Sequence, residues 1–298
     1  MLLQVQAKVN LQDKTATSNL AHNVARSLRP RMIIVSWAVF TCIVLAHNIH
    51  DLASVILGLI LFVAMYGIVA LHNDFSDVET DRINHRKDVP YAMGLLTQKQ
   101  LIITIVTLSA ITTIAGYILN YSVLLWVSLY ITLGYAYSGP LNVKSRGILA
   151  ALLLGFCYGA MPWLIGASAT NQLDHYNLLF LAFASFIFSS GIIVIKDFKD
   201  VKGDRATGKK TLLVSKGPSF TRYYYLSVTS FSYVLLVVFS RIFNLNVSFV
   251  FTGIAFGLLN YWLLMPQFLL SKAISRSTRG KWSRVIFFSY AVLLYFIT

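Results

Sequence analysis

The sequence predicts an all-helical protein that crosses a membrane several times. Of its 298 residues, 57% are hydrophobic and only 12% are charged, about half the charged share of an ordinary soluble domain. Long apolar runs recur along the chain, and none alternates apolar with polar residues as the strands of a membrane barrel do. Because a helix satisfies its own backbone hydrogen bonds inside hydrocarbon, these runs are expected to be helices.

Nine apolar runs are long enough to cross a bilayer, which takes roughly 20 residues as a helix. They are residues 31–47, 51–72, 101–119, 122–138, 147–169, 176–195, 223–240, 247–264 and 282–297. The runs extend along the whole chain, so we expect one integral-membrane domain, 1–298. Within it, residues 1–28 are expected to form a polar N-terminal segment in the cytoplasm.

The charged residues lie mainly on one predicted side of the membrane. The net charge is +14, from 25 Lys and Arg against 11 Asp and Glu. With the N-terminus in the cytoplasm, 24 of these 25 cationic residues face inward, and Arg241 alone lies in an outward loop. This is the positive-inside pattern of membrane proteins. It predicts an inward N-terminus and, with nine spans, an outward C-terminus. It also explains the positive charge without nucleic acid as a partner.

Eight of the eleven acidic residues lie in two inward loops, and seven of the eight fall in two segments that resemble each other. The first reads NDFSDVETDR (73–82) and the second reads KDFKDVKGDR (196–205), identical at six of ten positions and 123 residues apart. Each follows a span that runs from outside to inside. We therefore expect two parallel pseudo-repeat halves that each deliver an acidic cluster to the same membrane face.

Each segment carries three aspartates at positions i, i+3 and i+7, within about 60° of arc on an α-helix. They are Asp74, Asp77 and Asp81 in the first segment and Asp197, Asp200 and Asp204 in the second. Like charges on one helix face repel, so a cation should compensate them. Oxygen ligands without His or Cys favour Mg²⁺ or Ca²⁺, and Mg²⁺ typically joins carboxylates to substrate phosphates. A solvated acidic loop explains one cluster, but two equivalent clusters favour a Mg²⁺–diphosphate site.

Other polar residues near these segments suit the same ligand. Asn73 precedes the first triplet and offers a neutral oxygen, and Lys196 precedes the second triplet. A third inward segment, YAYSGPLNVKSR (135–146), follows a span that its proline should end, and it carries Tyr137, Lys144 and Arg146. Lys and Arg bind phosphate oxygens well, although the positive-inside bias also places basic residues here.

These motifs resemble those of the UbiA-type intramembrane prenyltransferases. The resemblance rests on N-D-x-x-D-x-x-x-D at 73–81, D-x-x-D-x-x-x-D at 197–204 and Tyr-Ser-x-Pro-x-x-x-Lys at 137–144. Arg29-Pro30, before the first span, also looks like a motif of that family. The resemblance covers the whole chain and implies nine helices around a central cavity with the aspartates at its cytoplasmic mouth.

The resemblance also implies a function. Members transfer a prenyl group from an isoprenyl diphosphate to a lipophilic acceptor, usually aromatic or quinone-like, in isoprenoid and quinone biosynthesis. By analogy, Mg²⁺–diphosphate would be held by Asn73, Asp74, Asp77, Asp81, Asp197, Asp200 and Asp204, the aspartates assisting ionisation of the diphosphate. Lys144, Arg146 and Lys196 would contact phosphate oxygens, and Tyr137 would line the cavity near the reacting carbon. A bacterial or archaeal cell membrane is the expected location.

The chain departs from one common pattern of that family. Many members carry Arg-Pro shortly after the first motif, where this chain has Val89-Pro90. Loss of that arginine is similar to the homogentisate-prenyltransferase branch. The segment KDFKDVKGDRATGKKTL (196–212) also resembles chlorophyll-synthase-like members and archaeal glycerophospholipid prenyltransferases. The sequence therefore leaves the acceptor open, together with the prenyl chain length.

Two other functions remain open at this point. A terpene cyclase on the same scaffold would ionise a diphosphate without a separate acceptor, and cyclic products would identify it. A transporter would place ionisable residues near the bilayer midplane. The middles of the nine predicted spans contain no Asp, Glu, Lys or Arg, so the positions of the acids favour an enzyme over a transporter.

Overall fold

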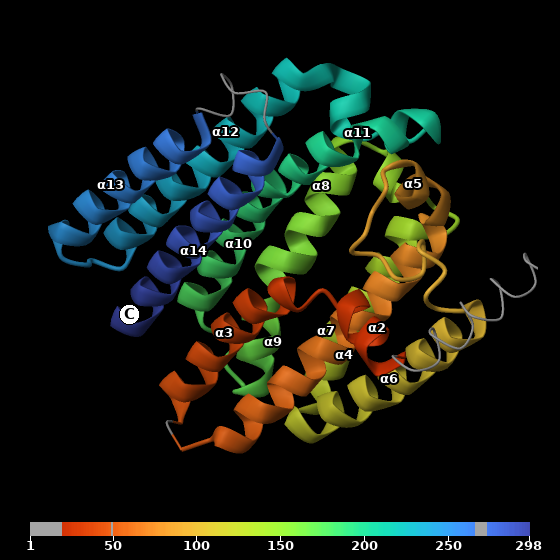
Figure 1. Ribbon diagram of the computed structural model, residues 1–298. Helices are drawn as coiled ribbons and strands as arrows, with labels where there is room; N and C mark the ends of the chain where they lie inside the picture. Colours follow the sequence, from red (N-terminus) through yellow and green to blue (C-terminus); the bar gives the residue numbers. More distant parts are fainter. Residues whose placement is uncertain (1–19, 49, 266–272) are drawn as a thin grey trace, which may run out of the picture.

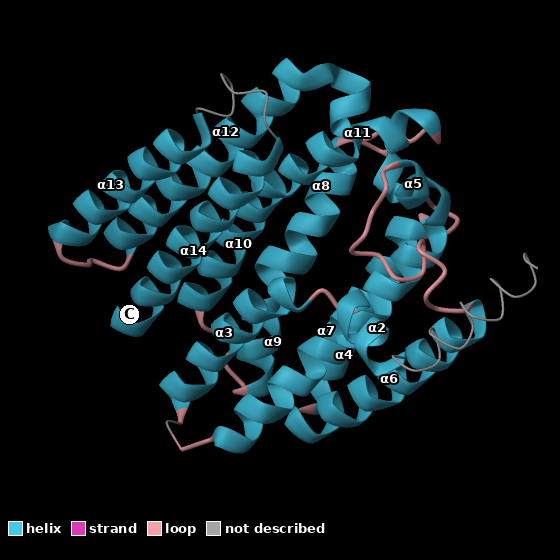
Figure 2. Ribbon diagram, in the orientation of Figure 1, coloured by secondary structure: helices cyan, strands magenta, loops and turns pink. Residues whose placement is uncertain are grey.

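The computed structural model describes residues 20–48, 50–265 and 273–298 of the chain, and within them it contains helices and loops but no strand (Figure 2). Up to the third inward segment the elements are α2 (Leu20–Ser27), α3 (Pro30–His47), α4 (Leu52–Ser76), α5 (Val78–Ile83), α6 (Gln98–Leu119), α7 (Tyr121–Ser138) and η1 (Val143–Ser145). The remaining elements are α8 (Ile148–Gly155), η2 (Phe156–Ala160), α9 (Met161–Ala169), α10 (Tyr176–Ile192), η3 (Ile193–Lys196), α11 (Asp197–Ala206), α12 (Leu212–Ile242), α13 (Val247–Leu264) and α14 (Ala273–Ile297). The predicted polar segment 1–28 lies outside the described residues up to residue 19, and its last part forms α2.

Each predicted span coincides with helix in the described part of the chain. By length and composition, six helices there can cross a membrane: Leu52–Ser76, Gln98–Leu119, Ile148–Ala169, Tyr176–Ala206, Leu212–Ile242 and Val247–Leu264. The first predicted span corresponds to a shorter apolar helix, Ile33–His47. The predicted spans 122–138 and 282–297 lie in α7 and α14. The all-helical class is thus confirmed, while the count of nine spans stays a prediction.

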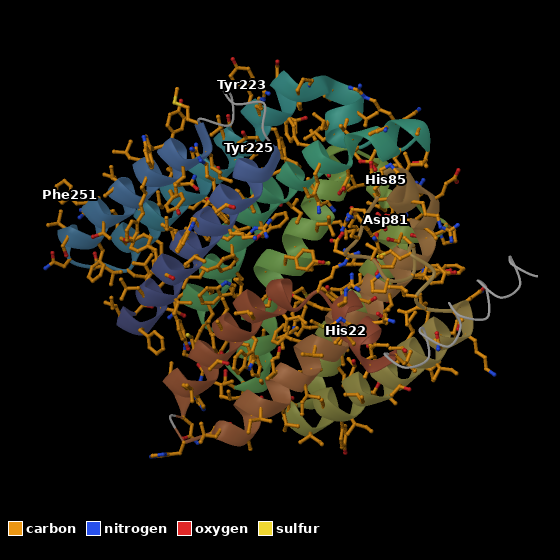
Figure 3. The ribbon with its side chains drawn as sticks, in the orientation of Figure 1. His22, Asp81, His85, Tyr223, Tyr225 and Phe251 are labelled. Atoms are coloured by element: carbon orange, nitrogen blue, oxygen red, sulfur yellow. The ribbon has the colours of Figure 1, made fainter. Side chains whose placement is uncertain are left out.

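The helices form two groups (Figure 1), and apolar side chains pack within each of them. Phe40, Phe62 and Tyr130 belong to the cluster between α3, α4, α7 and α9. Phe188 and Phe287 stack at 4.1 Å between ring centroids in the cluster that joins α10 to α14. Outer faces carry large exposed apolar side chains, such as Phe251 on α13 (Figure 3). Such extensive apolar exposure suits contact with lipid rather than water.

The helix formed by α8, η2 and α9 runs between the two groups and packs closely on α10. A Cβ atom added at Gly155 would lie 1.9 Å from the Ser190 hydroxyl oxygen, and one at Gly159 would lie 2.2 Å from the Ser185 carbonyl oxygen. Small residues therefore allow close backbone approach, as is common between membrane helices. This contact holds α10, which leads into the second acidic segment, in the middle of the bundle.

Candidate functional site

The two acidic segments meet at one end of the bundle, where α5 lies beside α11 (Figure 1). Asp81 and His85 mark this end in Figure 3. Between the segments is a cavity of about 130 Å³. It is lined by Arg29, Asn73, Asp77, Thr80, Asp81, Asn84, Arg86, Tyr137, Lys144, Lys196, Asp197, Lys199, Asp200, Asp204, Lys209 and Thr211. Residues far apart in the sequence thus form one polar cavity.

The two aspartate triplets differ in local structure. Asp197, Asp200 and Asp204 all lie in α11, as the periodicity predicts. The first triplet is not on one continuous helix, because the helix is interrupted at Asp77, where φ is −104° and ψ is 9°. The Asp77 carboxylate makes no hydrogen bond to the start of α5. Instead it accepts hydrogen bonds from Lys144 and Lys209 across the cavity. The helix is therefore interrupted at the residue that makes these bonds.

Helices α5 and α11 end in the same type of turn. The residue after each C-cap has a left-handed backbone, with φ of 51° at His85 and 70° at Gly208. The next amides, those of Arg86 and Lys209, donate to the carbonyl oxygen five residues earlier at 3.0 and 2.8 Å. This is the Schellman arrangement at a helix C-terminus. Because each turn reverses the chain, both cationic side chains return to the aspartates.

Arg86 connects the two acidic segments from the first half. Its Nη1 atom lies 3.7 Å from a carboxylate oxygen of Asp81 and 3.4 Å from one of Asp200. Its Nε and Nη2 atoms donate to the two oxygens of Asp88 at 2.6 and 2.7 Å. Burial alone would lower the pKa of Arg86, but these carboxylates outweigh it and raise that pKa. The guanidinium is therefore charged and fixed in place.

Lys209 makes the corresponding connection from the second half. Its Nζ atom lies 2.6 Å from Asp77 Oδ1 and 3.9 Å from Asp204 Oδ1. Lys144 also donates to Asp77 Oδ1, at 2.7 Å. Burial opposes the charged form of Asp77, but Lys209 and Lys144 outweigh it and lower its pKa. Two cations thus share one carboxylate oxygen.

The Tyr-Ser-x-Pro-x-x-x-Lys segment contacts both acidic segments. α7 ends at Ser138, whose hydroxyl donates to Asn73 Oδ1 at 2.8 Å. The Tyr137 hydroxyl accepts from Lys196 Nζ at 3.0 Å. Lys144 Nζ reaches the first segment, as described above, and burial lowers the pKa of this amine despite its carboxylate partner. This segment therefore connects the two acidic segments.

Asp74 lies behind the cavity, bound to a residue that the sequence did not assign to the site. It is only 1% exposed and forms an ion pair with Arg29. Arg29 precedes Pro30 and has a left-handed φ of 51°, which turns the chain between α2 and α3. The Oδ2 atom of Asp74 is buried without a hydrogen-bond partner. An unpaired buried oxygen is costly, so a further cationic partner would stabilise it.

The donor set fits Mg²⁺ in the presence of a phosphate ligand. In the described residues, no three His, Cys, Asp or Glu side chains converge closely enough to hold a metal by themselves. Mg²⁺ usually keeps several waters and takes only one or two carboxylates together with substrate phosphates. The unpartnered oxygen of Asp74 offers such a ligand. Burial also raises the pKa of Asp81 in spite of Arg86, so an added cation would favour its charged form.

Most of the predicted site residues are brought together, with one exception. Ten of the eleven either line the cavity or, like Asp74, lie directly behind it. Arg146 is exposed on the surface and does not line the cavity, because the short helix η1 points Lys144 inward two residues earlier. Sequence reasoning missed the contributions of Thr80, Asn84, Arg86 and Thr211, and it gave no individual role to Arg29, Lys199 or Lys209, which also line the cavity. Extending the 123-residue offset beyond the two motifs would have paired Arg86 with Lys209.

Comparison with known proteins identifies the family. The sequence model of the UbiA prenyltransferase family matches residues 34–292. The bacteriochlorophyll synthase 33 kDa chain of Rhodobacter capsulatus is 24% identical over 246 residues, which are 78% of this chain and 80% of that protein. The digeranylgeranylglyceryl phosphate synthase of Thermococcus kodakarensis is 30% identical over 177 residues, 59% of this chain and 61% of that protein.

The fold is also similar to that of a solved structure. A UbiA homologue from Archaeoglobus fulgidus, bound to GPP and Mg²⁺, has a TM-score of 0.69 to this chain at 15% sequence identity. The match covers 91% of this chain and 99% of that one. The resemblance that the motifs indicate is therefore confirmed. The chain belongs to the UbiA prenyltransferase family and is an integral-membrane prenyltransferase.

Proposed function

We propose that this protein transfers a prenyl group from an isoprenyl diphosphate to a lipophilic acceptor, and that the cavity between α5 and α11 holds the diphosphate. The observation that carries the proposal is the composition of the cavity lining. Five aspartates and six Lys or Arg residues face one space. Carboxylates can bind Mg²⁺, while the cations can bind phosphate oxygens. A neutral substrate would need neither the carboxylates nor the cations.

The proposed metal ligands are those that the motifs indicate: Asn73, Asp74, Asp77, Asp81, Asp197, Asp200 and Asp204. When bound, Mg²⁺ would neutralise charge that develops on the diphosphate as it leaves. In the structure, Lys144 and Lys209 are held by Asp77. With Asp77 holding Mg²⁺, these two lysines would be available to diphosphate oxygens. Lys196, which meets the hydroxyl of Tyr137 rather than a carboxylate, is a further phosphate contact.

The reaction that these groups support is an allylic substitution. The bond between C1 of the prenyl group and its diphosphate oxygen breaks, and the electron pair leaves with the diphosphate. The acceptor then forms a bond to C1 and loses a proton. Lys196 Nζ lies 5.3 Å from the centroid of the Tyr137 ring, so this ring lies beside the proposed phosphate site. An aromatic face there can stabilise positive charge on the prenyl carbon. Arg146 has no role here because it lies outside the cavity.

The acceptor is proposed to be an aromatic or quinone-like compound or another lipophilic molecule. Relatives named as bacteriochlorophyll synthase and digeranylgeranylglyceryl phosphate synthase support this range. Membrane lipid is the expected surrounding. The outer face of α13, where Phe251 and Trp262 are exposed, supports that expectation.

We also propose two equivalent halves and nine spans, with the N-terminus in the cytoplasm. The 123-residue offset relates α4 to α10 and α6 to the second part of α12. The pairs α4–α6 and α10–α12 are also the most extensively packed helix pairs in the described chain. These correspondences support the pseudo-repeat, and the charge distribution supports the orientation.

Product identification tests the proposal. The purified protein is incubated with Mg²⁺, labelled isoprenyl diphosphates of several chain lengths and a panel of lipophilic acceptors. We expect a prenylated acceptor and free diphosphate in equal amounts. A cyclic hydrocarbon or alcohol that forms without an acceptor would instead assign a cyclase, and the absence of diphosphate release with every donor would contradict the proposal.

A further inference from the structure

We infer that four residues at the contact of α5 with α11 form a clasp that sets the spacing of the two acidic segments, and that Asn84 is its main positioning residue. The four are Thr80, Asn84, Gly203 and Thr207, called here the α5–α11 clasp. The inference rests on the proposed function, because the spacing matters only if both segments hold one metal–diphosphate ligand.

Asn84 binds the backbone of α11 with both ends of its side-chain amide. Its Nδ2 atom donates to the Asp200 carbonyl oxygen at 3.1 Å, and its Oδ1 atom accepts from the Gly203 amide at 2.7 Å. Asn84 is itself the C-cap residue of α5. A single side chain at the end of one acidic segment therefore holds the main chain of the other.

Gly203 lets the two helices approach closely. A Cβ atom at this position would lie 2.4 Å from Asn84 Nδ2 and 2.7 Å from the Thr80 carbonyl oxygen. The second of these atoms belongs to the backbone of α5, so it cannot move aside as the end of a side chain can. Any larger residue must separate α11 from α5. The next residue, Asp204, is a cavity aspartate, so this separation moves the second acidic segment directly.

The second contact of the clasp is the counterpart of the first, with the roles of α5 and α11 exchanged. The hydroxyls of Thr80 and Thr207 lie 3.0 Å apart. The 123-residue offset that relates the acidic motifs maps Thr80 onto Gly203 and Asn84 onto Thr207. The two contacts are thus equivalent, like those of an isologous interface. Two contacts one helical turn apart oppose both sliding and rotation of one segment on the other.

The clasp opposes a repulsion that the site itself creates. Asp77 and Asp81 on one side face Asp200 and Asp204 on the other, and like charges destabilise such an arrangement. The bridging cations cannot hold the segments at a fixed spacing once a diphosphate attracts them. The clasp makes neutral hydrogen bonds that a diphosphate does not compete for directly. Removal of hydrogen-bond partners that position metal ligands without touching the metal typically lowers metal affinity or activity 10–100-fold.

Asn84 lines the cavity, so its positioning role must be distinguished from direct metal binding. The variant Asn84→Asp separates the two. An aspartate keeps an oxygen ligand for Mg²⁺ but loses the donor to the Asp200 carbonyl and places a carboxylate against that oxygen. The clasp predicts that Asn84→Asp and Asn84→Ala both raise the Mg²⁺ concentration for half-maximal diphosphate release by about tenfold, with a larger change in KM for the prenyl diphosphate than in kcat.

A matched pair at the equivalent position serves as the control. Thr207→Val removes the hydroxyl but keeps the shape of the side chain, whereas Thr207→Ser keeps the hydroxyl. We expect a several-fold rise in the Mg²⁺ requirement for Thr207→Val and less than a twofold change for Thr207→Ser. The same series is measured as thermal stabilisation by Mg²⁺ with inorganic pyrophosphate, a readout that does not depend on turnover.

The spacing itself can be measured by electron paramagnetic resonance. Glu79 on α5 and Lys202 on α11 are both exposed and occupy equivalent positions, so spin labels at Glu79→Cys and Lys202→Cys report the distance between the helices. Cys42 and Cys157 are replaced by alanine in this background. We expect a narrow distance distribution in the parent protein and a broader or longer one with Asn84→Ala or Gly203→Ala.

Several results would overturn the clasp. One is an unchanged distance distribution in Asn84→Ala. Another is a preserved or improved Mg²⁺ response in Asn84→Asp, which would make Asn84 a direct ligand. A third is lower thermal stability in Asn84→Ala with an unchanged Mg²⁺–pyrophosphate response, which would leave only a structural role. Failure of the proposed function looks different, because the parent protein itself would then release no diphosphate while the distance measurement still tests the clasp.

Discussion

Arg86 and Lys209 stand 123 residues apart and make equivalent ion pairs across the cavity. Each lies close to the third aspartate of its own acidic segment and to the second aspartate of the other segment, at distances from 2.6 to 3.9 Å. Each is delivered by a Schellman turn at the end of its helix. The two cations therefore cross-link the carboxylates of the two segments, and their removal should change both the stability of the protein and its ligand binding.

Replacing one of these cations should destabilise the metal-free protein. Lys209→Met leaves Asp77 with one lysine and increases the repulsion between the segments. Removing one partner of a buried pair typically costs about 3 kcal/mol or more, so a clear loss of thermal stability is expected in chelator. Mg²⁺ with pyrophosphate should restore part of the loss, because the metal replaces the missing charge beside Asp77, while the contact of Lys209 with the diphosphate stays absent. Lys210→Met, at an exposed neighbouring position, should have little effect. An equal loss with and without the ligands would contradict this interpretation.

The two equivalent turns should respond to substitution with opposite signs. His85 adopts a left-handed φ that glycine takes without strain. The equivalent position of the other turn is already a glycine, Gly208. His85→Gly should therefore stabilise the protein by about 1 kcal/mol, and Gly208→Ala should destabilise it by a similar amount. Thermal unfolding of both variants in the same detergent measures the difference. Stabilisation by Gly208→Ala would show that the turn is not needed.

Lys144 and Arg146 should differ sharply although they are two residues apart. Lys144 reaches Asp77 and Ser76 inside the cavity, whereas Arg146 is exposed. Loss of one charged donor that stabilises the departing diphosphate costs roughly 100-fold or more in rate. We expect that loss for Lys144→Met and less than a twofold change for Arg146→Met in the rate of diphosphate release. Equal losses in the rate of diphosphate release in both variants would show that Arg146 also belongs to the site.

Mg²⁺ and diphosphate should bind cooperatively. In the described residues no acidic cluster is preassembled to hold a metal by itself, and Mg²⁺ binds best where phosphates complete its coordination. Mg²⁺ alone should therefore shift the unfolding temperature little, pyrophosphate alone should shift it little, and the two together should shift it by more than their sum. Chelation should abolish diphosphate release, and added Mg²⁺ should restore it. Saturation by Mg²⁺ alone at micromolar concentration would contradict the cooperative site.

Much of the fold could be predicted from the sequence because membrane helices are marked by long apolar runs. All nine predicted runs coincide with helix, since hydrocarbon leaves the backbone few alternatives. The paired aspartates were found for a similar reason, because the same spacing occurs twice. The count of nine spans stays a prediction, since 31–47, 122–138 and 282–297 are not among the six helices of the described chain that are long and apolar enough to cross a membrane.

The parts that could not be predicted depend on contacts between distant segments. Periodicity places the first triplet on one helix, but Lys144 and Lys209 draw Asp77 away from the start of α5. Positive charge alone does not distinguish Arg146, which faces outward, from Lys144. Nothing in the local sequence marks Asn84 as a partner of Gly203, because this contact joins residues 119 positions apart.

The proposal that both acidic segments hold one diphosphate is tested by Mg²⁺-dependent diphosphate release in two single variants, Asp74→Ala and Asp197→Ala. Each removes one carboxylate from a different half, and each protein is first checked for unaltered helix content. We expect release from the parent protein and loss of release in both variants, because neither half supplies enough ligands alone. Release that persists in either variant at the parent rate would contradict a shared site.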